Sequence, residues 1–207
     1  MTDASVLRGK LLEALPVVRR PLVIRLCERS DLDALSGWPP YPEPYDVFSF
    51  SFARLSNAEL DSFHSSGRER KDRITLVADL DSARAIGYLS LIGIDWESRR
   101  CVNMGIRVHP DWCGQCIGSR MLTAVRDWWF VGSMSCLRLD VAGSNTRARS
   151  CYEKAGFSKI GEFWREAPDL RGKDLTEPKW RFLARHVRAV SSTPEVRFLL
   201  MELRSDK

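Results

Sequence analysis

The chain has 207 residues, of which 44% are hydrophobic and 29% are charged. These values are typical of a globular protein and exclude a disordered tail, a collagen-like fibre and a low-complexity array. The 32 lysine and arginine residues exceed the 27 aspartate and glutamate residues, giving a net charge of +5, but the basic residues are scattered. Without a motif that reads bases, this charge predicts no nucleic-acid partner. The scattered charges are interpreted as solvated surface, and attraction for an anionic small molecule is the alternative.

No segment indicates a membrane or secreted protein. The densest apolar run, residues 87–94, has the length of a strand and is much shorter than the ~18 residues of a membrane-spanning helix. The chain start, Met1 to Ala4, lacks the basic and apolar segments of a secretory signal. We therefore expect a cytoplasmic protein with no membrane partner.

The N-terminal residues predict a helix and a strand. Residues 5–20 form a short amphipathic pattern that Pro16 stops, and we interpret residues 1–20 as an extension ahead of a main domain at 21–207. The alternation of residues 22–26 predicts the first strand of that domain.

Two further helices and a rigid loop are expected next. Ser30-Asp31 can cap a helix through Leu35, and Ser56 or Asn57 can begin another that ends around Gly67. Between them, the segment Trp38 to Tyr45 contains four prolines, which remove amide donors and predict a rigid loop that carries aromatic residues.

The rest of the chain predicts a sheet with two main helices. Strands are expected at residues 74–78, 85–95, 100–108, 137–141, 157–164 and 196–203. Helices are expected at 117–131 and at 144–155, the second capped by Ser144 and ended by Gly156 in the left-handed region. The polar and basic segment 167–190 reads as a possible insertion with a helix at 179–190. This order predicts one mixed α/β domain.

The segment Met104 to Leu122 combines a strand, a turn of small residues and a helix start. The strand ends at Pro110, and an amphipathic helix begins at Ile117. A helix start exposes unpaired amides and the positive end of the helix dipole, so this turn predicts a backbone cradle for an anion. A plain strand-to-helix turn remains the alternative.

A second group of residues follows in the next helix. Asn145, Ala148 and Tyr152 stand at i, i+3 and i+7 and therefore share one helix face. Asn145 offers a donor and an acceptor at the helix start, and Tyr152 presents a phenol two turns along. Taken alone, a tyrosine at such a position is more often a half-buried core residue.

Together the two segments resemble the Gcn5-related N-acetyltransferase (GNAT) superfamily. Its cofactor motif, Gln or Arg, two residues, Gly, one residue, then Gly or Ala, follows a strand ending in Val-x-Pro, and here Val108-His109-Pro110 and Gly118-Ser119 are in register. Its second motif is matched at Asn145, Ala148, Tyr152, Gly156 and Phe157. The sequence departs at Cys113 and Cys116, which stand in place of Gln or Arg and of the first Gly. A register starting at Gln115 is rejected because Arg120 stands where a small residue is required.

The resemblance implies a GNAT-like single domain with a central, mostly antiparallel sheet, which binds acetyl-CoA as cosubstrate and acetylates an amine in a ternary complex. The amides of Gly114, Gln115, Cys116, Ile117, Gly118 and Ser119 would cradle the diphosphate of CoA. The backbone of Ile106 and Val108 would pair with the pantetheine arm, the Ile106 amide polarising the acetyl carbonyl, and Asn145 would bind the same arm. Tyr152 would protonate the departing thiolate, and Asp140 would serve as general base, with a solvent-facing strand aspartate as the alternative for Asp140.

The acceptor is expected to be a small-molecule or peptide amine. The family's first helices and the loop between them usually shape the acceptor side, which here includes the aromatic residues Trp38, Tyr41, Tyr45, Phe48 and Phe50, with Glu43 and Asp46 attracting a cation. Packing of these aromatics in the core is the alternative. A homodimer is possible.

Two other functions stay open. The segment Trp112-Cys113-Gly114-Gln115-Cys116 looks like the Trp-Cys-Gly-Pro-Cys motif of thioredoxin, so Cys113 and Cys116 could act in thiol–disulfide exchange or in redox regulation. Otherwise the six cysteines are expected to be reduced, and the one Cys-x-x-Cys pair lacks a second pair, so no metal is expected. A non-catalytic module with the same fold is the other alternative.

Overall fold

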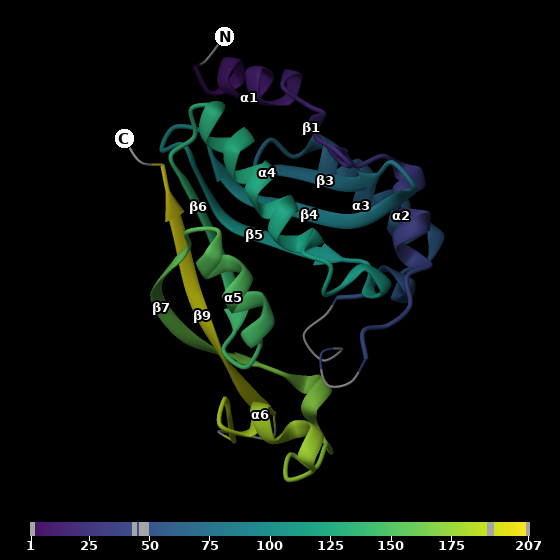
Figure 1. The fold of residues 1–207 in the computed structure, drawn as a ribbon, viewed down its shortest axis with the longest axis vertical. Coiled ribbons are helices and arrows are strands. Elements are labelled where there is room, and N and C mark those ends of the chain that lie inside the picture. Colours follow the sequence, from purple (N-terminus) through teal and green to yellow (C-terminus); the bar gives the residue numbers. More distant parts are fainter. Residues whose placement is uncertain (1–2, 43–44, 46–49, 190–192, 206–207) are drawn as a thin grey trace.

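The computed structural model describes residues 3–42, 45, 50–189 and 193–205 and has one central sheet (Figure 1). Its strands are β1 (Val17–Arg19), β2 (Leu22–Leu26), β3 (Arg73–Leu80), β4 (Ala83–Asp95), β5 (Arg100–Val108), β6 (Cys136–Ala142), β7 (Ser158–Glu166), β8 (Val187–Ala189) and β9 (Pro194–Arg204). They follow the order β1-β2-β3-β4-β5-β6-β9-β7, with β8 added to β9. The β5–β6 pair is parallel, and the other neighbours are antiparallel. The predicted mixed α/β fold with a mostly antiparallel sheet is confirmed.

Helices cover both faces of this sheet. They are α1 (Asp3–Glu13), α2 (Arg29–Ser36), α3 (Asn57–Glu69), α4 (Ile117–Val131), α5 (Thr146–Lys154) and the short α6 (Arg181–Ala184). One core cluster joins α1, α4 and α5 to the sheet through residues such as Leu89 and Met121. A second cluster joins α2 and α3 to the opposite face through Val77 and Tyr88. No helix in the described ranges has the length and apolar character needed to cross a membrane.

The first twenty residues contribute directly to this packing. Helix α1 ends at Glu13, and residues 17–19 form β1 on the edge of the sheet, where a single helix stopped by Pro16 was expected. Leu11 is fully buried, and its carbonyl accepts a hydrogen bond from Trp128 Nε1 at 2.9 Å. The segment expected to be an extension therefore covers the C-terminal half of α4.

The helix predicted at 179–190 is wrong. The structure has a 3-10 turn at Pro178–Trp180, the four residues of α6 and then strand β8. The apolar spacing fits a helix locally, but Val187 pairs with Val196 of β9, and Trp180 and Leu183 are buried in a small cluster of their own. Tertiary pairing therefore overrides the local pattern at this end of the chain.

Two helix starts differ from their predicted caps. Glu28 rather than Ser30-Asp31 caps α2, and the Asp31 carboxylate reaches back to the Glu28 amide at 2.8 Å. Asn145 rather than Ser144 caps α5: its Oδ1 accepts from the Ala148 amide at 3.1 Å. By contrast, Ser56 caps α3 as expected.

Candidate functional site

The sheet opens between its two central parallel strands. Strands β5 and β6 pair only where Arg100 lies opposite Cys136 and Cys101 lies opposite Leu137. Beyond these pairs β6 stays paired along its length to β9, and β5 to β4. The two strands therefore separate toward Val108 and Ala142, which leaves one backbone edge of β5 facing a gap.

A cavity of about 760 Å³ lies at this opening. Residues of β4, β5, β6, α5 and the start of α4 line it. All the predicted site residues except Gln115 are among them: Asp140, Tyr152, Ile106, Val108, Gly114, Cys116, Ile117, Gly118, Ser119 and Asn145. Gln115 is exposed, and its side chain donates to the Asp111 carbonyl at 3.1 Å. The fold thus brings two segments thirty residues apart in the sequence to one site.

The turn before α4 presents a run of unused amides. Among the described residues, none of the backbone N–H groups of Gly114–Ser119 donates a hydrogen bond to the chain, whereas the Arg120 amide bonds to the Cys116 carbonyl at 3.1 Å. Gly114 and Cys116 have φ values of 83° and 60°, in the left-handed region. These amides and the positive end of the α4 dipole lie together at the turn for which the sequence predicts an anion cradle.

The register of β5 decides which of its backbone groups face the gap. The His109 amide bonds to the Ile86 carbonyl at 2.8 Å, and residues of β5 pair with β4 in a regular antiparallel ladder. In such a ladder only every second residue of a strand forms hydrogen bonds with the neighbouring strand. His109 and Arg107 are such residues toward β4, so the N–H and C=O groups of Ile106 and Val108 point away from β4 and toward the gap. The Val108 carbonyl is already used there, because it accepts hydrogen bonds from the Tyr41 hydroxyl and, at 3.7 Å, from Cys113 Sγ.

Asn145 begins α5 at the opposite wall of the gap. Its Oδ1 is engaged in the helix cap, but its Nδ2 makes no hydrogen bond with the described residues. One face of this side chain therefore holds the helix start, and the other offers a donor to the cavity. On the next turn, Cys151 Sγ lies 3.1 Å from Ser119 Oγ and ties α5 to the start of α4.

Tyr152 is buried, with 8% of its surface exposed, and its ring packs against Phe157 at 6.0 Å between centroids. Burial strongly raises the pKa of its phenol, and Cys151, Asp140 and Tyr41 act in the same direction. The phenol therefore stays protonated at neutral and moderately alkaline pH. This state is the one that a proton donor needs.

Asp140 lies on β6 and lines the same cavity as Tyr152. Its Oδ2 is 2.9 Å from Arg165 Nη2 and accepts a hydrogen bond from Asn103 Nδ2 at 3.4 Å. Its side chain is 17% exposed. The carboxylate is therefore held in place by a cation and an amide through Oδ2, and Oδ1 makes no hydrogen bond with the described residues.

The two cysteines of the turn are free thiols in different settings. Cys116 is exposed, and Cys113 is half-buried. Burial raises the pKa of the Cys113 thiol even though Arg147 Nη2, 3.8 Å from the sulfur, opposes the shift. A reactive thiolate needs the opposite shift, so this setting does not favour thioredoxin-like chemistry.

The aromatic residues expected around the acceptor divide into two groups. Tyr41, Tyr45 and Phe50 line the cavity. Trp38 does not: its Nε1 donates to the Ala85 carbonyl at 3.1 Å, and its ring packs against His109. Glu43, Asp46 and Phe48 lie outside the described residues.

Sequence reasoning missed a further part of the wall, on the side of the sheet that faces α2 and α3. It consists of Phe63, Tyr88, Ser90 and Arg107. Tyr88 and Arg107 are paired across β4 and β5, and Tyr88 is buried in the second core cluster. The alternation of β4 and β5 places these side chains opposite Leu89 and Ile106, but the sequence alone gave no sign that the strand face opens into a cavity.

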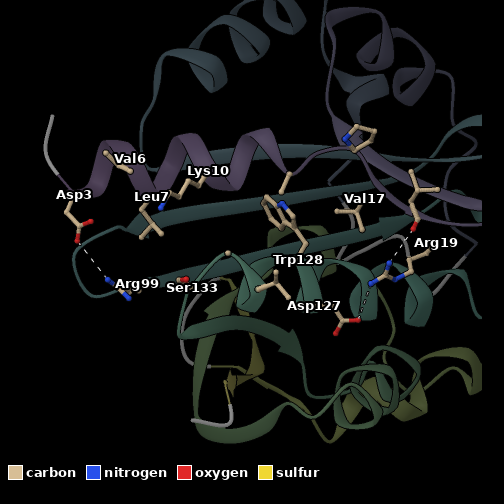
Figure 2. A pocket seen from close by; sticks show the side chains of 15 residues that line it. Asp3, Val6, Leu7, Lys10, Val17, Arg19, Arg99, Asp127, Trp128 and Ser133 are labelled. Atoms are coloured by element: carbon tan, nitrogen blue, oxygen red, sulfur yellow. Dashed lines mark hydrogen bonds and ion pairs between the residues drawn. The ribbon is translucent and has the colours of Figure 1, made fainter.

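A second cavity, of about 530 Å³, lies away from this opening, between α1, β1 and the C-terminal end of α4 (Figure 2). Two ion pairs connect its walls, Asp3 with Arg99 at 3.9 Å and Arg19 with Asp127 at 4.0 Å (Figure 2). None of the predicted site residues lines it. The chemistry predicted from the sequence therefore belongs to the opening between β5 and β6.

Comparison with known families decides the identity of this site. The model of the acetyltransferase (GNAT) family matches residues 37–157, which is more than half of the chain. The chain belongs to the GNAT acetyltransferase family. It is therefore an acetyl-CoA-dependent N-acetyltransferase that transfers an acetyl group to an amine, with acetyl-CoA as cosubstrate.

Solved structures of GNAT enzymes share its fold. The spermidine N-acetyltransferase from Vibrio cholerae, in complex with CoA and spermine, is 18% identical, with a TM-score of 0.64 over 89% of this chain and 95% of that one. A chimera of the Vibrio cholerae enzyme and hSSAT is 19% identical, with a TM-score of 0.64 over 89% of this chain and 95% of that one. No curated protein matches the chain. At these identities the likeness establishes the fold, and the acceptor has to be argued from the site.

Proposed function

We propose that this GNAT acetyltransferase moves the acetyl group of acetyl-CoA directly to the amino group of a small molecule, while both are bound in the cavity between β5 and β6. The observation that carries the proposal is the run of unused amides at Gly114–Ser119, which opens into the same cavity as the buried phenol of Tyr152. An anion cradle and a proton donor in one cavity are what transfer from a CoA thioester requires.

In this proposal the backbone does most of the cofactor binding. The amides of Gly114–Ser119 hold the diphosphate, and the dipole of α4 favours its negative charge. The pantetheine arm lies along the free edge of β5, where the Ile106 groups and the Val108 amide are available, and Asn145 Nδ2 donates to it from α5. Because the Tyr41 hydroxyl occupies the Val108 carbonyl, Tyr41 shifts when the arm pairs there.

The reaction follows from this placement. The unprotonated amine attacks the thioester carbonyl, and the Ile106 N–H stabilises the negative charge that develops on its oxygen. The carbon–sulfur bond then breaks, and the thiolate of CoA takes the proton of the Tyr152 phenol. The amine nitrogen loses one proton as the amide forms. The Tyr152 phenolate regains a proton from solvent, so the two transfers balance in each turnover.

Asp140 is the proposed acceptor of the amine proton. An ionised carboxylate beside Arg165 is a weak base for an ammonium group, so the transfer runs through a water molecule. Replacing Asp140 with Asn tests the role, since the amide keeps the size of the side chain and removes its basicity. An unchanged kcat for Asp140→Asn excludes it.

The solved neighbours suggest a small-molecule amine as the acceptor. One of them is a spermidine N-acetyltransferase that binds spermine. The aromatic residues of the wall, Tyr41, Tyr45, Phe50, Phe63 and Tyr88, suit a small acceptor with an apolar part. A screen of small amines that measures the release of free CoA identifies the acceptor. Peptides with a free N-terminus form the comparison group.

A matched pair of variants tests the amide cradle. Gly118→Pro removes one N–H from the first turn of α4, a position that tolerates proline, and should weaken acetyl-CoA binding about 10- to 100-fold, the value of a hydrogen bond to a charged group. Gly118→Ala keeps the N–H, and its Cβ would meet only ordinary contacts, the nearest at 3.6 Å. It should bind nearly as wild type. Equal affinities of the two variants, measured by calorimetry with folded protein, would contradict the proposal.

A further inference from the structure

Arg107 stands apart from the other cations of the cavity. It lies on β5 between Ile106 and Val108, so its side chain points to the opposite face of the sheet from theirs. Its cross-strand partner is Tyr88, and directly opposite residues of an antiparallel pair share one face. The guanidinium therefore lines the cavity on the side of α2 and α3, away from the start of α4.

This guanidinium has no acidic partner among the described residues. Its recorded contact is with the ring of Phe50, 5.3 Å from the ring centroid. Of the other arginines of the cavity, Arg165 pairs with Asp140 at 2.9 Å. Arg147 also lies over an aromatic ring, that of Tyr45, but it stands beside Cys113 at the turn before α4. Burial lowers the pKa of Arg107, which reflects the cost of holding its charge there. A buried charge with no counter-ion in the described part of the chain is expected to meet one in a ligand.

The surroundings of Arg107 define what that ligand group can be. Tyr88 and Ser90 place two hydroxyl groups on the same wall, and Phe50 and Phe63 supply aromatic surface. Gly105 keeps the wall open, because a Cβ at this position would lie 2.8 Å from Ser90 Oγ. One guanidinium with neighbouring hydroxyls matches the single charge and two planar oxygens of a carboxylate, which arginine binds through paired hydrogen bonds.

The anions of the cosubstrate lie elsewhere. The amide cradle of Gly114–Ser119 and the guanidinium of Arg147 lie together at the turn before α4, where Arg147 Nη2 is 3.8 Å from Cys113 Sγ. Arg107 lies on the other face of β5, among residues that pack toward α2 and α3. Its partner is therefore a group of the acceptor and not a phosphate of CoA.

We propose that the acceptor is an amine that also carries a carboxylate, an amino acid with an apolar or aromatic side chain, and that Arg107 binds this carboxylate. The inference rests on the proposed function, since it concerns the acceptor half of the same cavity. Arg107 is then a specificity residue: an amine without an anion leaves the guanidinium unpaired, and a diamine adds a second positive charge beside it.

A binding experiment tests this without relying on turnover. CoA-loaded protein is titrated with N-acetylphenylalanine and with N-acetylphenethylamine, which differ only in the carboxylate. In the wild type the carboxylate should tighten binding about 10- to 100-fold, as expected for a charge-assisted pair. In Arg107→Met, which keeps the apolar stem, the two ligands should bind alike. Arg84→Met, a change on the exposed end of β4 outside the cavity, should keep the wild-type ratio.

The outcomes separate this inference from the proposed function. The carboxylate subsite is overturned if the wild type binds the two acetylated ligands with equal affinity, or if the ratio of their affinities is the same in Arg107→Met. Acetyl-CoA binding and acetyl transfer are unaffected by either result. A protein that does not bind acetyl-CoA overturns the proposed function first. In the transfer assay, phenylalanine should outperform phenethylamine and 1,4-diaminobutane in kcat/KM for wild type, and the Arg107→Met variant should lose this preference mainly through KM. The reverse order of acceptors contradicts the inference.

Discussion

At the scale of single residues, the proposed mechanism uses the phenol of Tyr152, which stays protonated at neutral pH. Tyr152 is 8% exposed, and burial raises the pKa of its hydroxyl well above the ordinary value of 10.0. The sequence suggested two roles for this residue, core packing and proton donation. The ring packs against Phe157, which agrees with the first role, and the residue also lines the cavity, where proton donation remains our proposal.

Removing the hydroxyl of Tyr152 should slow the chemical step without weakening cosubstrate binding. Tyr152→Phe should lower kcat about 100-fold, the lower range for a positioned acid, and leave the acetyl-CoA Kd unchanged. Because the protonated phenol is the active form and its pKa is raised, wild-type kcat should show no alkaline decline from this group up to about pH 10. A decline below that pH that disappears in Tyr152→Phe, or full kcat in the variant, contradicts the role. Steady-state kinetics across pH measure both.

Cys116 explains how the chain departs from its family's motif and still builds the cradle. It has φ of 60°, a left-handed conformation that glycine adopts without cost, and it caps α4 with no side-chain hydrogen bond. This position is the one that the sequence comparison matched to the first glycine of the motif. Cys116 thus adopts a backbone conformation that favours glycine, with a side chain that is exposed and leaves the neighbouring amides free.

At the scale of elements, Asn145 has one observed function, the cap of α5, and one proposed function, cofactor binding. Its Oδ1 caps α5 by accepting from the Ala148 amide, and its Nδ2 is open to the cavity. The sequence predicted the ligand role and assigned the cap to Ser144. That assignment was wrong because Ser144 is buried, with 2% of its surface exposed, and its hydroxyl has no partner among the described residues.

Two variants separate these functions. Asn145→Ala removes both groups and should cost about 1 kcal/mol of unfolding free energy, as well as cofactor affinity. Asn145→Ser keeps a good capping oxygen but has no amide donor, so its stability should stay near wild type while acetyl-CoA binds more weakly. Urea unfolding and calorimetry give the two quantities. If Asn145→Ser binds acetyl-CoA as wild type does, the amide has no role in binding.

The elements that the sequence predicted best are those with strong, regular patterns. Strand β5 and helix α4 begin and end at the predicted residues. The strand has a clear β pattern that ends just before Pro110, and the helix has a single apolar face that ends just before Gly132. The helix expected at 179–190 failed because β8 is defined by pairing with β9, a contact that local spacing does not encode.

At the scale of the whole molecule, the cavity exists because strands β5 and β6 separate after their first pairs. The parallel pair β5–β6 is held at Arg100 and Cys101 and then separates, which frees the edge of β5 beside the start of α4. Two motifs with fixed spacing predicted the residues that we propose for the cofactor half of this site. The sequence could not identify Arg107, Tyr88 or Ser90, because these residues meet only through strand register and carry no local signal.

The most direct measurement is a crystal structure of the protein with acetyl-CoA. It should show the diphosphate within hydrogen-bond distance of amides in Gly114–Ser119, the pantetheine arm between β5 and β6 in contact with Ile106, and the sulfur beside the Tyr152 hydroxyl. A diphosphate bound away from these amides, or a thioester out of reach of Tyr152, would contradict the proposed mode of acetyl-CoA binding.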